Sequence, residues 1–203
     1  MEQTLNAYEY ARVLDNDPLA ELVHQRMQLL PFDERFLLVL QLNDSRRCET
    51  FLHNLRNQSR QVNLAQNGLF YAAQFGSINR LDYFLTHWKI DIDTRRSLND
   101  SSQSTTALLT AIACDQSEAA KFLIFRHADP NLKGQHGNAL VTAVHYRSDT
   151  SLIRLLLDKN ADLTARHPDY ERLTLREFCT LTHRVNAKAE LDLYIVQIGR
   201  AHV

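Results

Sequence analysis

The sequence has little of what commonly marks a catalytic or nucleotide-binding protein. Its 203 residues include only five glycines and four prolines. It contains no glycine-rich phosphate loop and no H-E-x-x-H, G-x-S-x-G or C-x-x-C motif. These absences exclude the common nucleotide-binding, zinc-protease, serine-hydrolase and dithiol classes. We therefore predict that the protein is not an enzyme and that it has no cofactor and no metal site.

Excess charge and long apolar segments are also missing. Twenty-three Lys and Arg side chains against 24 Asp and Glu give a net charge of −1 and a pI of about 6.7, so we predict no direct binding to nucleic acid. The longest apolar run, Phe36–Leu40, is far shorter than the roughly 20 residues of a membrane span. The start at Met1 lacks the basic and apolar regions of a signal peptide. We expect no membrane partner.

Cysteine is scarce, and its spacing argues against disulfides. The three cysteines, Cys48, Cys114 and Cys179, are odd in number and far apart in the chain. This pattern is typical of a protein from a reducing compartment, and we expect a cytoplasmic or nuclear location. Cys48 and Cys179 lie on apolar helical stripes, so we predict that both are small core residues.

The sequence does contain an internal repeat. Two five-residue stretches, His127–Asn131 and Asn160–Thr164, are near copies 33 positions apart. Each follows a short apolar block, Phe122–Ile124 in the first case and Leu155–Leu157 in the second. Self-similarity at this period indicates stacked supersecondary units in place of one globular core. The functional question is then what the stacked surface binds.

The repeat extends in both directions. One copy runs from Asn67 to Asp93, the next from Thr106 to Asn131, and the third from Gly137 to Thr164. These copies resemble ankyrin repeats, whose pattern is G-x-T-P-L-H-x-A-A-x-x-G, then an apolar second helix, then G-A-D-x-N. The resemblance is close over residues 62–165 and looser over 166–198. It implies an all-α ankyrin-repeat solenoid, made of stacked helix pairs joined by short β-hairpin-like turns.

The resemblance divides the chain into a single array with helical caps. We expect the turn that closes a degenerate repeat to lie at Gln61–Asn63, and a closing helix pair at Leu173–Leu181 and Ala187–Ile198. The predicted units are an N-terminal helical cap at 1–32, the degenerate repeat at 33–63, repeats at 64–95, 101–133 and 134–166, and a C-terminal capping repeat at 167–203.

Matched residues have physical roles, and departures from the pattern are informative. Thr106 stands where a helix N-cap is expected, and the alanines of the motif are small because helices pack closely there. The Asp-x-Asn ends are turn formers. His127 and Asn160 replace a glycine that caps the second helix in a left-handed conformation, which Asn and His tolerate better than most residues. Asp115 replaces the glycine that survives as Gly76.

One connection is longer than the repeat requires. Asp91 and Asp129 are 38 positions apart, whereas Asp129 and Asp162 are 33 apart. The added polar residues between Asp93 and Thr105 have two interpretations. They are a neutral insertion, which surface loops accept at little cost, or they enlarge a recognition finger in which Arg95, Arg96 and Leu98 contact a partner.

The ends of the first helices supply a second candidate surface. Phe75, Cys114 and Tyr146 occupy equivalent positions there, and the rings either fold back onto neighbouring units or form an exposed anchor stripe. The register of the repeats alone places Cys114 and His145 at adjacent positions. Their proximity is therefore no evidence for a metal site or a catalytic Cys–His pair, and we predict neither. The complete predicted partner-binding set is Phe75, Arg95, Arg96, Leu98, Cys114, His136, His145, Tyr146, Arg166 and Tyr170.

The resemblance implies a protein-interaction module that binds a folded protein partner. Short ankyrin proteins include inhibitors of cyclin-dependent kinases, inhibitors of Rel-type transcription factors and small cell-cycle kinase subunits, so we expect an adaptor, an inhibitor or a regulatory subunit. Two alternatives remain open. One is an enzyme with a non-standard site at the capped ends. The other is a substrate role, since the segment from Leu123 to Asn131 resembles a site of asparaginyl hydroxylation apart from Pro130.

Overall fold

The computed structural model describes residues 58–97, 104–146 and 148–201. The predicted N-terminal cap, most of the degenerate repeat, Cys48 and Leu98 lie outside these residues. The chain divides into two compact units, residues 1–71 and 72–203, and the fold described below is that of the second. Helix α5 (Gln58–Gln74) runs across the division.

Helix α5 corrects one prediction. The closing turn expected at Gln61–Asn63 is wrong, because the helix is continuous through these residues. The segment from Gln58 to Asn67 has no glycine, proline or aspartate to stop a helix, whereas each later repeat has an aspartate at its closing turn.

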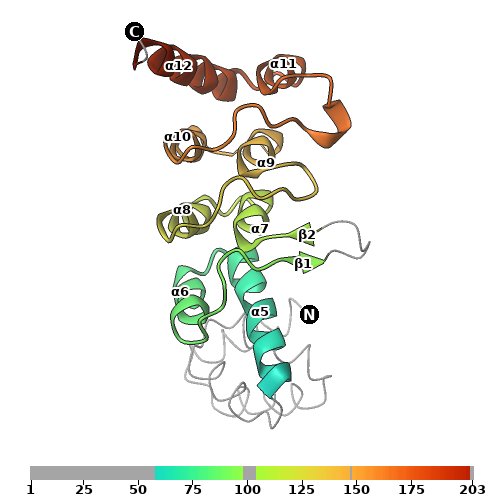
Figure 1. Cartoon of the computed structure of the whole chain (residues 1–203), viewed down its shortest axis with the longest axis vertical. Coiled ribbons are helices and arrows are strands. Elements are labelled where there is room, and N and C mark those ends of the chain that lie inside the picture. The colour runs from blue at the N-terminus through green and yellow to red at the C-terminus, as the bar shows by residue number, and fades with distance from the viewer. Residues whose placement is uncertain (1–57, 98–103, 147, 202–203) are drawn as a thin grey trace, which may run out of the picture. The chain divides into compact units, whose positions relative to one another are not determined.

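The second unit is built from helix pairs (Figure 1). In this view α6 (Ile78–Thr86), α8 (Ser117–Phe125), α10 (Thr150–Asp158) and α12 (Val185–Ala201) form one column. The other column contains α7 (Ala107–Ala113), α9 (Ala139–His145) and α11 (Leu175–Leu181). Each helix of a pair packs on its mate and on the neighbouring repeat, for example α7 on α8 and α9. Helices α11 and α12 are the expected closing pair.

The first helices α7, α9 and α11 each begin at a side-chain cap. The hydroxyl of Thr106 accepts the N–H of Leu109 at 3.3 Å, as predicted for an N-cap. In the next repeat the Oδ1 of Asn138 accepts the N–H of Val141 at 3.0 Å. Helix α11 has a full capping box, because the carboxylate of Glu177 also accepts the N–H of its cap, Thr174, at 2.7 Å. These caps satisfy backbone donors that a helix start leaves unpaired.

The predicted left-handed turn conformations are confirmed. His127 has φ of 68°, Asn160 has 60° and Asp115 has 57°, next to 68° for Gly76. This geometry ends the preceding helix with a backbone hydrogen bond, which the residue after the left-handed position donates to the carbonyl five residues earlier. The N–H of Ala128, the residue after His127, donates to the carbonyl of Leu123 at 3.0 Å. Non-glycine side chains therefore occupy positions that favour glycine.

The long connection forms a hairpin. Strand β1 (Arg96–Ser97) pairs antiparallel with β2 (Ser104–Thr105), so that Arg96 lies opposite Thr105. Figure 1 shows the two strands on the side of α7 that faces away from the α6–α8 column. The next repeat has a shorter version, a single bridge between Gly134 and Gly137.

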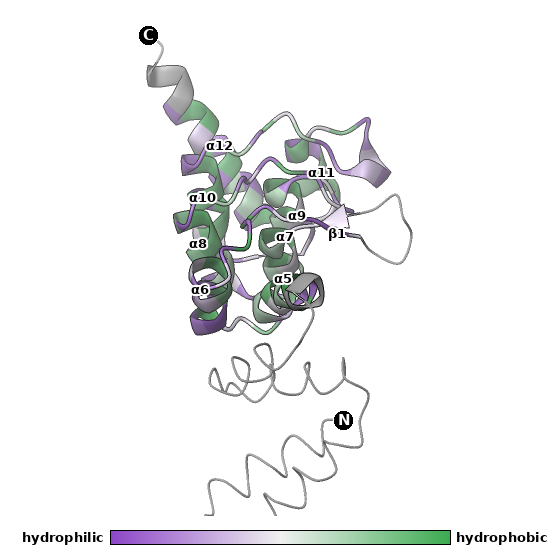
Figure 2. Cartoon of the chain, turned by 60° about the horizontal axis from the view of Figure 1, so that its bottom comes forward, coloured by the Kyte–Doolittle hydropathy of each residue, from purple (hydrophilic) through white to green (hydrophobic). Residues whose placement is uncertain are grey.

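Apolar side chains fill the space between the two helix columns. Hydrophobic residues are concentrated on α7 to α10, and the connecting loops are more hydrophilic (Figure 2). The small residues Ala111 and Ala143 are completely buried, which allows the first helices to pack closely, as predicted. Cys179 is 1% exposed, which confirms it as a core residue. Every helix in the described part of the chain falls short of the length and apolarity needed to cross a membrane.

Hydrogen bonds link each closing turn to the next. The N–H of Asp129 donates to the carboxylate of Asp93 at 3.0 Å. One repeat later, the N–H of Asp162 donates to the Oδ1 of Asn131 at 2.7 Å. The Nδ2 of Asn131 in turn donates to the carbonyl of Asn160 at 3.2 Å. The Asp-x-Asn motif thus forms a turn within its own repeat and also joins neighbouring repeats.

Candidate functional site

The hairpin and the ends of the first helices surround one cavity. Its volume is about 180 Å³. The hairpin contributes Arg96, the C-cap of α7 is Cys114, the loop between α8 and α9 contributes His136, and the C-cap of α9 is Tyr146. These four residues belong to the predicted partner-binding set and come from four separate segments of the chain. The structure therefore brings Arg96 of the predicted finger to the ends of the first helices, where Cys114 and Tyr146 lie, whereas Phe75 and Arg95 do not line this cavity.

The aromatic residues on this surface differ in their environment. Phe75 is 44% exposed and Tyr146 is 40% exposed, so neither ring is folded into the core. Tyr146 is nevertheless held in place: its hydroxyl lies 3.1 Å from Nε2 of His136, and its ring packs edge-on against the same imidazole. Tyr146 thus has a hydrogen-bond partner and a ring contact, although it is nearly as exposed as Phe75.

The base of the hairpin orders its arginines. Arg95 is exposed, and its guanidinium donates to the hydroxyl of Ser104 across the two strands at 2.9 Å. Arg96 is only partly exposed and lines the cavity. The two arginines of the predicted finger therefore lie in different places. Arg95 is on the outside of the hairpin, and Arg96 is on the cavity wall.

Three histidines meet beside this cavity. His136 precedes α9, His145 is the last residue of α9, and His167 precedes the 3₁₀ helix η1 (Pro168–Tyr170). The rings of His136 and His145 are stacked with centroids 4.2 Å apart, and those of His145 and His167 are 4.8 Å apart. The Nε2 of His167 lies 2.9 Å from the Nδ1 of His145, within hydrogen-bond distance.

The other side of the histidine cluster is aromatic. Phe178 of α11 stacks on His167 at 5.0 Å between centroids, and Tyr170 approaches the same ring edge-on at 5.4 Å. Tyr170 is 42% exposed. Of the two predicted partner-binding residues in this region, Tyr170 therefore adjoins the histidine cluster, and Arg166 belongs to another cavity.

The electrostatics favour neutral rings at His136 and His167. Burial lowers the pKa of His136, and proximity to His145 and His167 lowers it further, while Asp169 opposes the shift. Burial also lowers the pKa of His167, followed by the effect of His145. Neutral imidazoles can stack, and each offers one ring nitrogen with a free lone pair as a hydrogen-bond acceptor or metal ligand.

Sequence reasoning placed His136 and His145 on a partner-binding surface but missed His167. The available signal was position: His136 and His167 lie 31 residues apart, close to the 33-residue repeat. They therefore fall on equivalent loops of successive repeats, on either side of the α9 end. The sequence shows a histidine on each of these two loops. Only the register of the stacked repeats shows that both lie close to His145.

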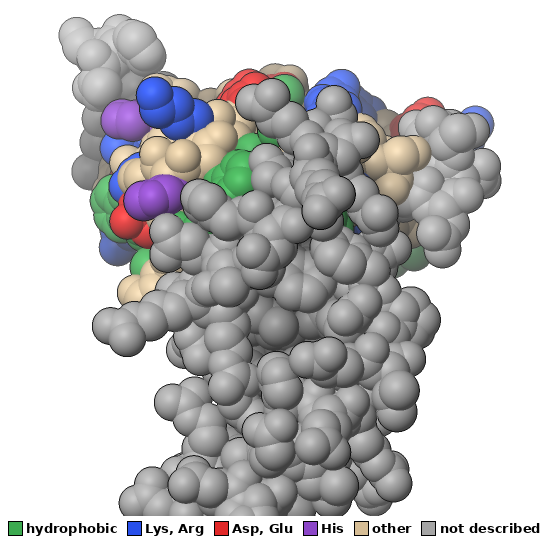
Figure 3. Space-filling model, turned by 90° about the horizontal axis from the view of Figure 1, so that it is seen from below, with side chains coloured by type: hydrophobic (Ala, Val, Ile, Leu, Met, Phe, Trp, Pro, Cys, Tyr) green, Lys and Arg blue, Asp and Glu red, His purple; other side chains and the backbone are tan. Residues whose placement is uncertain are grey.

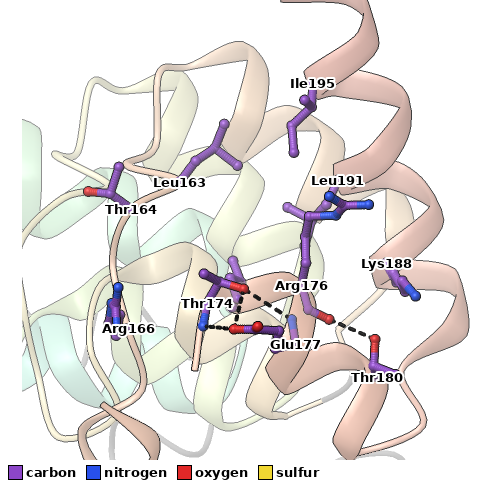
Figure 4. A pocket seen from close by; sticks show the side chains of 11 residues that line it. Leu163, Thr164, Arg166, Thr174, Arg176, Glu177, Thr180, Lys188, Leu191 and Ile195 are labelled. Carbon is purple, nitrogen blue, oxygen red and sulfur yellow. Dashed lines mark hydrogen bonds between the residues drawn. The ribbon is translucent and has the colours of Figure 1, made fainter. Parts of the chain in front are cut away.

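A larger cavity of about 600 Å³ lies at the C-terminal repeat (Figure 4). Arg166 from the loop after α10, Arg176 from α11 and Lys188 from α12 contribute positive charge to its walls, and Leu163 and Ile195 contribute apolar surface. Most of its polar groups already have partners. The carboxylate of Glu177 caps α11, and the Nε of Arg176 lies 2.5 Å from the carboxylate of Asp192. This cavity was not predicted except through Arg166.

Where Figure 3 shows described residues, along the upper part of the view, the visible side chains include basic, acidic, histidine and apolar ones.

The comparisons with known proteins agree with this architecture. The family model for ankyrin repeats in three copies matches residues 36–134 and 69–167. A search of curated proteins found no match. The helix pairs, the capped first helices, the left-handed turns and the linked closing turns all follow the ankyrin pattern. The matched segments together cover well over half of the sequence, and the chain belongs to the ankyrin-repeat family.

Proposed function

We propose that this protein is an adaptor, inhibitor or regulatory subunit that binds a folded protein through its hairpin and the adjoining cavity. Ankyrin repeats are in general protein-interaction modules. The observation that carries the proposal for this surface is the convergence of Arg96, Cys114 and Tyr146 around one small cavity beside an exposed hairpin.

The volume of the cavity indicates which kind of partner side chain it can accept. A dry cavity of roughly 150 Å³ is large enough for benzene, so the volume of about 180 Å³ found here suits one aromatic or branched side chain. Tyr146 on the wall offers an aromatic contact of the kind that dominates interface energies. Arg95 at the rim favours an acidic residue on the partner, which acts mainly on the association rate.

The cysteines of the described part of the chain fit binding better than catalysis. Cys114 is exposed at the surface, yet partial burial of its sulfur in the cavity wall raises the pKa of its thiol. Burial raises the pKa of the Cys179 thiol to about 11. A reactive cysteine needs a lowered pKa, and both of these thiols stay protonated at neutral pH. The alternative of a cysteine-based site receives no support from either residue.

The substrate alternative is likewise not favoured. Asn131 uses both polar atoms of its side chain in the hydrogen bonds that link successive turns. Hydroxylation would require these bonds to open first.

The proposal is tested by capture of binding partners from native cells with full-length protein, compared at equal folded fraction. Tyr146→Ala should reduce the recovery of specific partners at least tenfold, because a central aromatic anchor contributes about 2 kcal/mol or more. The matched control is Phe125→Ala, which removes another exposed aromatic side chain, on α8 in the other helix column. Equal recovery with Tyr146→Ala and wild type, or a loss confined to Phe125→Ala, would contradict the proposed surface.

The regulatory role is tested once a partner is known. If the partner is a kinase or a transcription factor, adding wild-type protein should change its kinase activity or DNA binding, and Tyr146→Ala should not. Capture with no change in partner activity would favour an adaptor over an inhibitor or a regulatory subunit.

A further inference from the structure

The three clustered histidines form a ligand set for a metal ion. One ring nitrogen from each of His136, His145 and His167 lies within 4.8 Å of the corresponding nitrogens of the other two. Three imidazoles with no protein carboxylate or thiolate among the ligands suit Zn²⁺, and they do not suit Mg²⁺ or Ca²⁺, which prefer oxygen. We propose that His136, His145 and His167 bind one Zn²⁺ ion and leave its fourth coordination position open.

The ligand atoms are available. His136 has its Nε2 beside the hydroxyl of Tyr146, while its Nδ1 is buried without a hydrogen-bond partner. A buried polar atom with no partner is uncommon in native proteins and calls for an explanation. A metal ion bound at this nitrogen would supply the missing partner.

The other two ligands already face each other. Nδ1 of His145 and Nε2 of His167 are 2.9 Å apart, so one of them carries the proton that lies between them. A metal ion would take the place of this proton, which moves through solvent to the other nitrogen of the same ring, so that each ligand stays a neutral imidazole. Because a proton on the ligand nitrogen competes with the metal ion, binding weakens in acid.

Groups around the cluster can orient the ligands. The backbone N–H of Asp169 donates to Nδ1 of His167 at 3.2 Å, and the carboxylate of the same residue lies 3.8 Å from that nitrogen. Once Nε2 binds metal, Nδ1 must carry the proton, so the bond from the N–H opens and the carboxylate moves closer to accept the proton. Arg184 donates to the backbone carbonyl of His145 at 2.9 Å and fixes the end of α9. Such outer partners set ring orientation in metal sites and strengthen the binding of the ion.

Metal binding requires the stack to open slightly. The rings of His136 and His145 are nearly parallel, with 14° between their planes, so their lone pairs do not yet converge. Tetrahedral zinc at about 2.05 Å from each nitrogen needs ligand nitrogens roughly 3.3 Å apart. His167 is 2% exposed and held against Phe178, whereas His136 and His145 are only half-buried. The two less buried rings therefore turn toward the buried one.

The test uses full-length protein without a histidine tag, titrated with Zn²⁺ and separately with Co²⁺. We expect saturable binding of one ion per chain, a rise in the melting temperature with Zn²⁺ that a chelator reverses, and visible absorption bands of tetrahedral Co²⁺. His136→Asn and His145→Asn should each weaken Zn²⁺ binding at least tenfold. The matched control is His127→Asn, which removes an exposed histidine from a turn where Asn is tolerated.

His167→Asn can fail for a structural reason, because this residue packs in the core, so the two half-buried histidines decide the result. Equal Zn²⁺ affinity for wild type and His136→Asn at full helical content would overturn the proposal. So would an equal loss of affinity in His127→Asn. A thiolate-to-cobalt absorption band in the near ultraviolet would also overturn it, because it would assign the ion to a cysteine.

Discussion

Asn131→Ala tests whether the closing turns couple neighbouring repeats. The Oδ1 of Asn131 accepts the N–H of Asp162 at 2.7 Å, and its Nδ2 donates to the carbonyl of Asn160 at 3.2 Å. Alanine removes both bonds. The turn within the repeat keeps its own bond, in which the N–H of residue 131 donates to the carboxylate of Asp129 at 2.8 Å. The change therefore acts mainly on the link between repeats.

The magnitude follows from the number and exposure of these bonds. An intramolecular hydrogen bond contributes about 0.5–1.5 kcal/mol net, and a buried donor that loses its partner costs more. Both bonds of Asn131 are near the surface, where water can replace the lost partner. The lower part of the range applies, and we expect Asn131→Ala to lower the free energy of unfolding by about 1–2 kcal/mol.

The assay is urea unfolding followed by far-ultraviolet circular dichroism, with native-state hydrogen exchange of the Asp162 amide. Because ankyrin units interact only with their neighbours, protection should fall at Asp162 and less at the amide of Asp129. The control is Lys133→Ala, a nearby exposed loop residue. An unchanged free energy of unfolding, or equal loss of protection at both amides, would refute the reasoning.

The remaining predictions concern conformation, charge and packing. Asp93→Asn should raise the free energy of unfolding at neutral pH, because burial raises the pKa of Asp93 above its usual value; the hydrogen bond from the N–H of Asp129 opposes this rise, and the carboxylates of Asp129 and Asp91 add to it. A raised carboxyl pKa means that stability is lost as pH rises through the folded pKa, so the gain should vanish in acid; a pH-independent gain would contradict this. His127→Gly should raise stability by about 1 kcal/mol, because φ is 68° there, and Asn160→Gly should raise it less; chemical denaturation checks the order, and a loss in His127→Gly would show an unrecognised side-chain contact. Leu156→Ala should lower the free energy of unfolding by roughly 2–5 kcal/mol, since the side chain is 0% exposed. Under conditions where the variant is fully folded, titration calorimetry should show the same partner affinity as wild type.

Much of the repeat architecture was predictable because the ankyrin pattern is local. Thr106 caps its helix through residues three positions away, and His127 and Asn160 adopt left-handed turns that close the preceding helix. Periodicity and turn chemistry act over one repeat, so they are legible in the sequence. Local sequence also explains the wrong prediction at Gln61–Asn63. The repeat period placed a turn there, but the helix continues because no residue in the segment stops it.

The sequence by itself determined the family, the helix pairs and the residues that form the turns. Only the tertiary structure decided which side chains meet across repeats. His136, His145 and His167 lie on three different segments, and their rings come together because neighbouring repeats stack in one register. The cavity between the hairpin and Tyr146 arises in the same way. A repeat pattern fixes what each unit contains, whereas a site shared by several units depends on how far each is translated and turned against the next.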